Sequence, residues 1–185
     1  MDTRCKEQVD LYGDLISRPK WDEYYLTMAF VLAQRSFDPS SKCGTVIVSK
    51  DNRVLSTGYN GPIKGSIDHE IPLTRPQKYC HFLHGEENAL LAYGGSFQDI
   101  QGATAYITGR PCHKCLRMLL QKGITKIVYG PNVTKVVDQS DIEAQEIMLR
   151  HRSVEMKEMP KDMIQNLLKK TFDYVELKSH QEKNY

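Results

Sequence analysis

Apolar side chains along this chain repeat first with the period of a helix and then with that of strands. Between Trp21 and Arg35, apolar and aromatic residues recur every three or four positions. Residues 43–48 and 53–58 are short runs rich in strand-forming residues, and Asp51-Asn52 lies between them as a turn signal. The pattern therefore predicts one helix followed by a β-hairpin.

From residue 84 onward, the predicted elements alternate between helix and strand. Helices are expected at 84–93, 111–122 and 138–151, and strands at 103–108, 125–129 and 153–156. A hairpin followed by alternating helices and strands is typical of helices packed on both faces of one sheet. We therefore expect an α/β fold, a three-layer α/β/α sandwich on a mixed five-stranded sheet.

One long segment between the hairpin and the next helix has no clear period. Residues 59–79 are polar and contain several prolines and glycines, and loops of this length in a compact domain are usually functional. We expect one domain over residues 21–175, preceded by a lead-in of residues 1–20 and followed by a polar tail of residues 176–185.

Composition and charge exclude several classes of protein. The 185 residues are 40% hydrophobic and 26% charged, as in ordinary soluble domains. The net charge of +2 is too small to indicate a nucleic-acid binder. No apolar run could span a bilayer, and the charged N-terminus does not resemble a signal peptide. The five cysteines are an odd number, which favours a reducing compartment over a disulfide framework, so we expect a cytoplasmic protein.

Two short motifs carry the candidate chemistry. His84 and Glu86 form H-x-E, and Cys112 and Cys115 follow Pro111 in P-C-x-x-C. Cysteines three apart project from nearly the same face of a helix, and Pro111 suits the first helical position. A catalytic zinc takes three protein ligands and leaves a fourth position for water. We therefore predict that His84, Cys112 and Cys115 bind Zn²⁺ and that Glu86 transfers protons.

Other interpretations of these residues remain open. A lone C-x-x-C could be a redox pair or half of a structural zinc site, although the sequence has no second C-x-x-C. A second, structural zinc could use His69, Cys80 and His81, but their spacing matches no familiar site. H-x-E followed by P-C-x-x-C is, however, the signature of zinc-dependent nucleobase deaminases.

With these motifs, the chain resembles the deoxycytidylate (dCMP) deaminases of the cytidine deaminase family, including compact phage-encoded members. The resemblance runs from about Trp21 to Met156 and rests, besides the zinc motifs, on residues 35–39, 43–48, 56–62 and 123–129. The chain departs from the family at Thr45 and Gly85, where alanine is usual.

The resemblance implies hydrolytic deamination of a deoxycytidine nucleotide, dCMP to dUMP and ammonia, with dCTP as a second substrate left open. It implies that Glu86 shuttles protons, that Asn60 contacts the sugar and that a backbone N–H near Thr45 holds the base carbonyl. Arg35 is our candidate for the phosphate, because guanidinium matches phosphate geometry, and Tyr129 completes the substrate-binding set. Arg110 could pair with a phosphate or face solvent.

The resemblance also implies a hexamer that is activated by dCTP with Mg²⁺ and inhibited by dTTP. The candidate residues for this allosteric nucleotide are Gly58, Tyr59, Gly61, Gly65 and Asp68. Two alternatives stay open: a zinc deaminase that acts on nucleic-acid bases, and a non-catalytic, deaminase-derived nucleotide-binding zinc protein. Membranes and nucleic acid are not expected partners.

Overall fold

The computed structural model describes residues 18–131 and 138–170. Its centre is a five-stranded sheet in the order β2-β1-β5-β6-β7. The first strand, β1, pairs antiparallel with both β2 and β5, whereas β5, β6 and β7 run parallel. The strands are β1 (Gly44–Val48), β2 (Val54–Tyr59), β5 (Thr104–Ile107), β6 (Lys126–Tyr129) and β7 (Glu155–Glu158). The predicted mixed sheet is confirmed.

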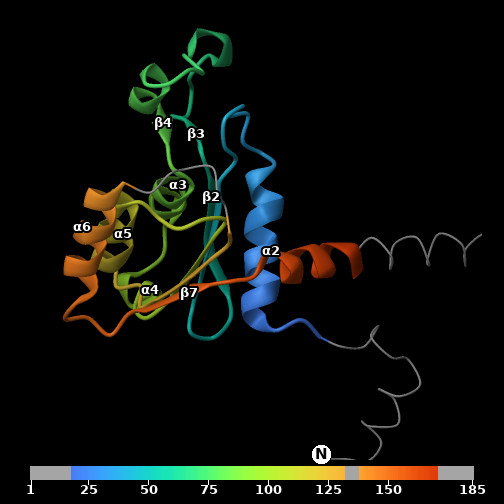
Figure 1. Ribbon diagram of the computed structural model, residues 1–185, viewed down its shortest axis with the longest axis vertical. Helices are drawn as coiled ribbons and strands as arrows, with labels where there is room; N and C mark the ends of the chain where they lie inside the picture. Colours follow the sequence, from blue (N-terminus) through green and yellow to red (C-terminus); the bar gives the residue numbers. More distant parts are fainter. Residues whose placement is uncertain (1–17, 132–137, 171–185) are drawn as a thin grey trace, which may run out of the picture.

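Helices cover both faces of this sheet (Figure 1). One face is covered by α2 (Trp21–Ala33) together with a helix of residues 161–170. The other face is covered by α3 (Gly85–Ala92), α5 (His113–Gln121) and α6 (Gln139–Leu149), with the short α4 (Phe97–Ile100) below them. The predicted three-layer sandwich is therefore confirmed.

Side chains of β1 alternate between the two faces of the sheet, so this strand contributes to two hydrophobic clusters. All five residues of β1 are buried. Val46 and Val48 belong to the cluster beneath α2, whereas Ile47 belongs to the cluster beneath α3 and α5. A strand covered on both faces is mostly apolar, so the run of residues 43–48 does not alternate between apolar and polar side chains, and Thr45 is its one hydroxyl residue.

The structure corrects three details of the predicted elements. Pro111 does not begin a helix: Cys112 is the N-cap of α5, with extended backbone angles, and Pro111 precedes it. The helices α4 and 161–170 were not predicted. The second of these packs Ile164 against the α2 cluster, a tertiary contact that helical spacing in a short polar segment does not reveal.

Residues 61–83, which we call the projecting segment, rise above the layered body (Figure 1). The segment starts and ends in a two-stranded sheet of β3 (Gly61–Pro62) and β4 (Phe82–Leu83), and it contains two 3₁₀ helices, Asp68–Glu70 and Gln77–Cys80. The predicted structureless loop thus has local structure of its own.

The predicted domain limits are only partly covered by the described residues. The helix α2 begins at Trp21, next to the predicted boundary at residue 20. Residues 1–17 and 171–185, which include the predicted boundary at 175 and the tail, lie outside the described residues. No helix within the described ranges is long and apolar enough to cross a membrane.

Candidate metal centre

The three predicted zinc ligands meet where two helices begin. His84 is the N-cap residue of α3, Cys112 is the N-cap residue of α5, and Cys115 lies in the first turn of α5. Glu87, three residues after His84, accepts a hydrogen bond from the His84 backbone N–H at 2.7 Å and so fixes the start of α3. The positive ends of two helix dipoles therefore point at the site, which favours thiolate ligands.

The spacing of the ligand atoms fits a zinc ion. His84 Nδ1 lies 3.6 Å from Cys112 Sγ and 3.3 Å from Cys115 Sγ, and all three ligand atoms lie within 4.8 Å of one another. Tetrahedral zinc, with bonds of about 2.3 Å to sulfur and 2.0–2.1 Å to nitrogen, places a sulfur and a nitrogen ligand about 3.6 Å apart. Two sulfurs and one imidazole at these separations suit zinc, with one position left open.

The pKa values of the two cysteine ligands are shifted in opposite directions. The hydrogen bond between them, offset by burial, lowers the pKa of Cys112 to about 3. The same hydrogen bond, together with burial, raises the pKa of Cys115. Both sulfurs bind zinc as thiolates, so metal binding at this site releases a proton.

Glu86 lies beside the ligands without joining them. Its side chain is buried, and burial raises its pKa, although the nearby His84 opposes the shift. Cys115 lies within hydrogen-bond reach of the carboxyl group. On its other side, Glu86 adds to burial in raising the pKa of Cys43 to about 12. A carboxyl group with a raised pKa can both release and accept protons near neutral pH.

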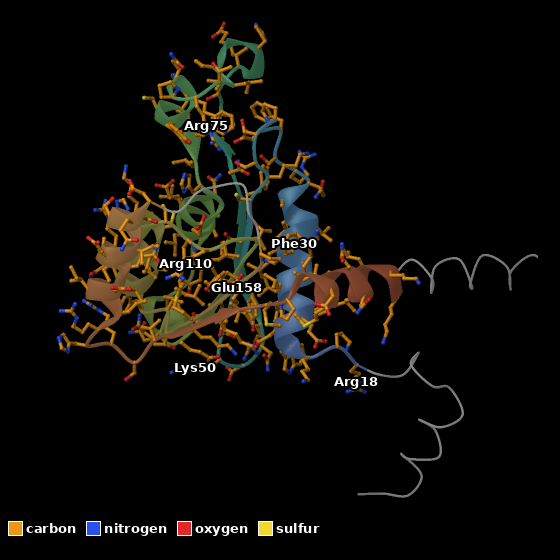
Figure 2. All side chains as sticks on the ribbon, viewed as in Figure 1. Arg18, Phe30, Lys50, Arg75, Arg110 and Glu158 are labelled. Carbon is orange, nitrogen blue, oxygen red and sulfur yellow. The ribbon has the colours of Figure 1, made fainter. Side chains whose placement is uncertain are left out.

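A pocket leads from His84 towards the projecting segment. Cys43 and Asn60 line it near the metal site, and Asp38, Arg75 and Lys78 line it farther out. Figure 2 shows Arg75 on the projecting segment. Lys78 and Asp38 offset each other's charge, so Arg75 gives the pocket a net positive charge, which suits a ligand with a polar ring and an anionic group.

Asn60 is held by the protein on three sides. Its Oδ1 accepts a hydrogen bond from the Cys43 N–H at 2.7 Å, and its Nδ2 donates to Asp38 Oδ2 at 3.1 Å and to the Ser41 carbonyl at 2.9 Å. Both amide hydrogens are thus used, so only the second lone pair of Oδ1 could meet a sugar hydroxyl. The side chain mainly shapes the pocket wall.

A buried ion pair, which motif analysis missed, anchors the projecting segment. Lys78 Nζ lies 2.7 Å from Asp38 Oδ2 and 2.9 Å from Oδ1, and both side chains are only 3% exposed. Burial raises the pKa of Asp38, but Lys78 and the backbone N–H groups of Ser40 and Ser41 together outweigh it, so the pKa of the carboxyl group is lowered. Because the partners are 40 positions apart, no local spacing could have revealed the pair.

A second groove contains the residues predicted for allosteric control. Gly58, Tyr59, Gly61 and Gly65 line it, and Asp68 begins the 3₁₀ helix three residues beyond Gly65. Arg35, our candidate for the substrate phosphate, also lines this groove and is not among the residues that line the His84 pocket.

The remaining predicted residues lie on the sheet and at its edge. Thr45 is wholly buried in β1, and its hydroxyl has no hydrogen-bond partner among the described residues. Tyr129 is buried at the end of β6, with the Arg110 guanidinium 5.9 Å from its ring centre. Arg110 is exposed, and its Nε donates a hydrogen bond to Gln145 at 3.0 Å.

The residues considered as ligands of a second zinc do not form a metal-binding group in the described part of the chain. His69, Cys80 and His81 are all exposed. Within residues 18–131 and 138–170, the group of side chains close enough to hold a metal ion is the His84, Cys112 and Cys115 trio.

Comparison with known proteins agrees with this geometry. The family profile "Cytidine and deoxycytidylate deaminase zinc-binding region" matches residues 19–131, which contain both motifs. A deoxycytidylate deaminase of Mycobacterium phage D29 is 39% identical over 131 residues, 62% of this chain and 97% of the phage protein. The deoxycytidylate deaminase of Pongo abelii is 34% identical over 116 residues, 60% of this chain; the match spans 64% of that relative's length.

A solved structure is also similar. The dCMP deaminase of cyanophage S-TIM5, crystallised in complex with dCMP and dUMP, has 26% sequence identity and a TM-score of 0.57. The match covers 77% of this chain and 99% of the cyanophage chain.

Proposed function

The chain belongs to the cytidine and deoxycytidylate deaminase family, and from this premise we propose that it hydrolyses dCMP to dUMP and ammonia. The observation that carries the proposal is the metal-ligand trio with buried Glu86 beside it, at the inner end of a pocket lined by two cations. The cyanophage neighbour, crystallised with dCMP and dUMP, supports the choice of nucleotide.

The proposed hydrolysis requires a water molecule, one group that transfers protons, and a cytosine ring held in a fixed position. Zinc held by His84, Cys112 and Cys115 would supply Lewis-acid activation of water. Glu86 takes a proton from the attacking water and delivers it to N3 of the cytosine as the new C4–O bond forms. Glu86 then takes the remaining proton from the new C4 hydroxyl and passes it to the 4-amino group, so that the C4=O bond forms, the C4–N bond breaks and ammonia leaves. Its pKa, raised by burial, suits both transfers.

We assign the phosphate to Arg75, because it lines the pocket that begins at His84, whereas the other lining cation, Lys78, is paired with Asp38. The guanidinium of Arg75 lies 5.8 Å from the ring centre of Tyr79, which restrains it at the pocket wall. The earlier candidate, Arg35, lines the second groove instead. Asn60 and the backbone near Thr45 remain our candidates for the sugar and the base carbonyl, and Tyr129 for a wall of the site.

We assign the second groove to a regulatory nucleotide. Arg35 and Lys64 provide cations there, and the backbone at Gly61 and Gly65 leaves room for a ligand, whereas Gly58 packs closely against α3. We propose activation by dCTP with Mg²⁺, inhibition by dTTP, assembly into a hexamer and a cytoplasmic location. Rate measurements with each triphosphate, together with light scattering, test the regulation and the assembly independently of the deamination itself.

One incubation separates the proposed function from its alternatives. Purified zinc-loaded protein is incubated with dCMP, dCTP, CMP, cytidine and single-stranded oligonucleotides that contain cytosine, and products are resolved by chromatography. We expect dUMP from dCMP. Conversion of the oligonucleotides alone would support a deaminase of nucleic-acid bases. If nothing is converted while nucleotides still bind, the protein is a non-catalytic zinc protein.

A further inference from the structure

Two side chains of α6 hold the turn that carries both cysteine ligands. Asp141 and Gln145 are four residues apart, so they lie one above the other on the helix. They are among the most buried polar residues described: Asp141 is 7% exposed and Gln145 is 0% exposed. Gln145 Nε2 also donates a hydrogen bond to Asp141 Oδ2 at 3.1 Å, which joins the two into one unit.

Asp141 contacts the first residue of α5. The His113 backbone N–H donates to Asp141 Oδ1 at 2.8 Å, and the His113 ring nitrogen Nδ1 is hydrogen-bonded to the same oxygen. The first N–H groups of any helix lack partners within that helix. Asp141, which belongs to another helix, therefore accepts a hydrogen bond from one of the N–H groups that α5 leaves unpaired at its start.

Gln145 contacts the two residues before the first cysteine. Its Nε2 donates to the Pro111 carbonyl at 3.1 Å, and its Oε1 accepts from Arg110 Nε at 3.0 Å. Gln145 is thus hydrogen-bonded to residues 110, 111 and 141 from a position that solvent does not reach.

The residue at the N-cap of α5 explains why side chains of α6 contribute to the start of α5. Most helices are capped by a serine, threonine, aspartate or asparagine at the N-cap. The N-cap residue of α5 is Cys112, whose sulfur lies 3.6 Å from His84 Nδ1 and makes no side-chain cap hydrogen bond. Sulfur is a weaker hydrogen-bond acceptor than the oxygen of a usual cap residue, so an oxygen acceptor from another helix strengthens the start of α5.

We propose that Asp141 and Gln145 are positioning residues for the metal centre, which set the placement of Cys112 and Cys115 relative to His84. Loss of a group that orients metal ligands typically weakens metal binding about tenfold to hundredfold. The proposal rests on the proposed zinc site but not on the identity of the substrate. It makes zinc affinity depend on side chains of α6, none of which belongs to the metal-ligand trio.

The test compares three single variants of the full chain. Gln145→Met keeps the volume and removes all three hydrogen bonds, and Asp141→Asn keeps the shape and one acceptor oxygen but removes the charge. Glu143→Gln is the matched control, because Glu143 is exposed on the same helix and pairs only with Gln139 in the described contacts. Zinc affinity is measured by competition with a chromophoric chelator, and ligand geometry by the visible absorption of the Co²⁺-substituted proteins.

We expect zinc to bind about tenfold to hundredfold more weakly in Gln145→Met and Asp141→Asn, with shifted cobalt bands. The control should match the parent protein in both measurements. Parental zinc affinity and cobalt spectra in both α6 variants would overturn the proposal, even if their thermal stability were lower. If Gln145→Met does not fold, the milder Asp141→Asn decides the question. Neither measurement requires turnover, so failure of the parent to deaminate dCMP would refute only the proposed function.

Discussion

Thr45 Oγ1 lies against the space that a side chain at Gly85 would need. A Cβ built on Gly85 would come within 3.2 Å of this oxygen and 3.3 Å of the Cys43 carbonyl. The hydroxyl is buried and has no hydrogen-bond partner among the described residues. Thr45 and Gly85 therefore form a pair in which a larger residue on the strand is matched by a smaller one on the helix.

This pairing predicts that substitutions at the two positions are coupled. Gly85→Ala should destabilise the protein by about 1–3 kcal/mol, because a tightly packed site has to shift to admit the methyl group. In a Thr45→Ala background the same substitution should cost much less, since the oxygen is gone and alanine is a better helix former than glycine. Denaturant unfolding of both single variants and the double variant, all zinc-loaded, measures the coupling. Additive effects would contradict the pairing.

The metal assignment predicts one equivalent of zinc per chain, lost in Cys112→Ala. Cys43→Ala is the matched control: Cys43 lines the pocket but does not belong to the ligand trio, so its variant should keep zinc. Metal analysis by mass spectrometry of the three proteins gives the answer. Full zinc in Cys112→Ala would rule out the assignment. A second equivalent in the parent would instead point to a site involving His69, Cys80 and His81.

Glu86→Gln should abolish turnover while zinc content, fold and dCMP binding persist. The amide has nearly the same volume and Glu86 is not a ligand, so only proton transfer is removed. General acid–base groups typically contribute about 10²- to 10⁴-fold, and Glu86 serves two transfers, so we expect the upper end of that range. Turnover of dCMP measured beside metal content checks this. A loss of less than about tenfold would show that another group moves the protons.

The phosphate assignment is tested by comparing dCMP with deoxycytidine. Losing a charge-assisted contact costs about 1.5–3 kcal/mol, so Arg75→Ala should lower kcat/KM for dCMP about tenfold to hundredfold. The same variant should leave kcat/KM for deoxycytidine almost unchanged, because the nucleoside has no phosphate. Arg35→Ala is the matched comparison, since Arg35 lines the second groove. If Arg35→Ala, and not Arg75→Ala, lowered kcat/KM for dCMP, Arg35 would be the residue that binds the phosphate.

The Asp38–Lys78 pair predicts an acid-sensitive contribution to stability. Lys78 lowers the pKa of Asp38 below its ordinary 3.8 in the folded protein, so the pair stabilises fully above that value. As the pH falls through the lowered pKa, Asp38 becomes protonated and this contribution is lost. Lys78→Met should cost about 3–5 kcal/mol near neutral pH, because it leaves Asp38 buried and unpaired. The difference from the parent should shrink as the pH falls below the pKa.

The control for this prediction is an ion pair on the surface. Arg53 and Asp51 lie 3.8 Å apart with side chains 80% and 76% exposed, so Arg53→Met should change stability by less than about 1 kcal/mol. Denaturant unfolding across the acid range compares the proteins, and the metal site is the same in all of them. Equal costs for Lys78→Met and Arg53→Met would show that burial does not strengthen the Asp38 pair.

The amino-acid sequence alone was enough to predict the sheet, the layers and the metal ligands. Strands and helices appear as local periods of apolar residues, and the buried strand β1 reads as an apolar run of residues 44–48. His84 and Glu86 lie two positions apart, and Cys112 and Cys115 three, so each motif brings its chemistry together within a single helix start. Information of this kind is contained in neighbouring residues and does not depend on the rest of the fold.

Only the tertiary structure decided which distant residues support that chemistry. Asp38 meets Lys78 across 40 positions, Asp141 meets His113 across 28, and Gln145 contacts Pro111 across 34. The structure also shows that Arg35 lines the second groove, and that Arg75 lines the pocket that begins at His84. These partners meet only when the helices pack on the sheet. Packing buries their polar groups, and a buried polar group is hydrogen-bonded to a neighbour in space, which can be far away in sequence.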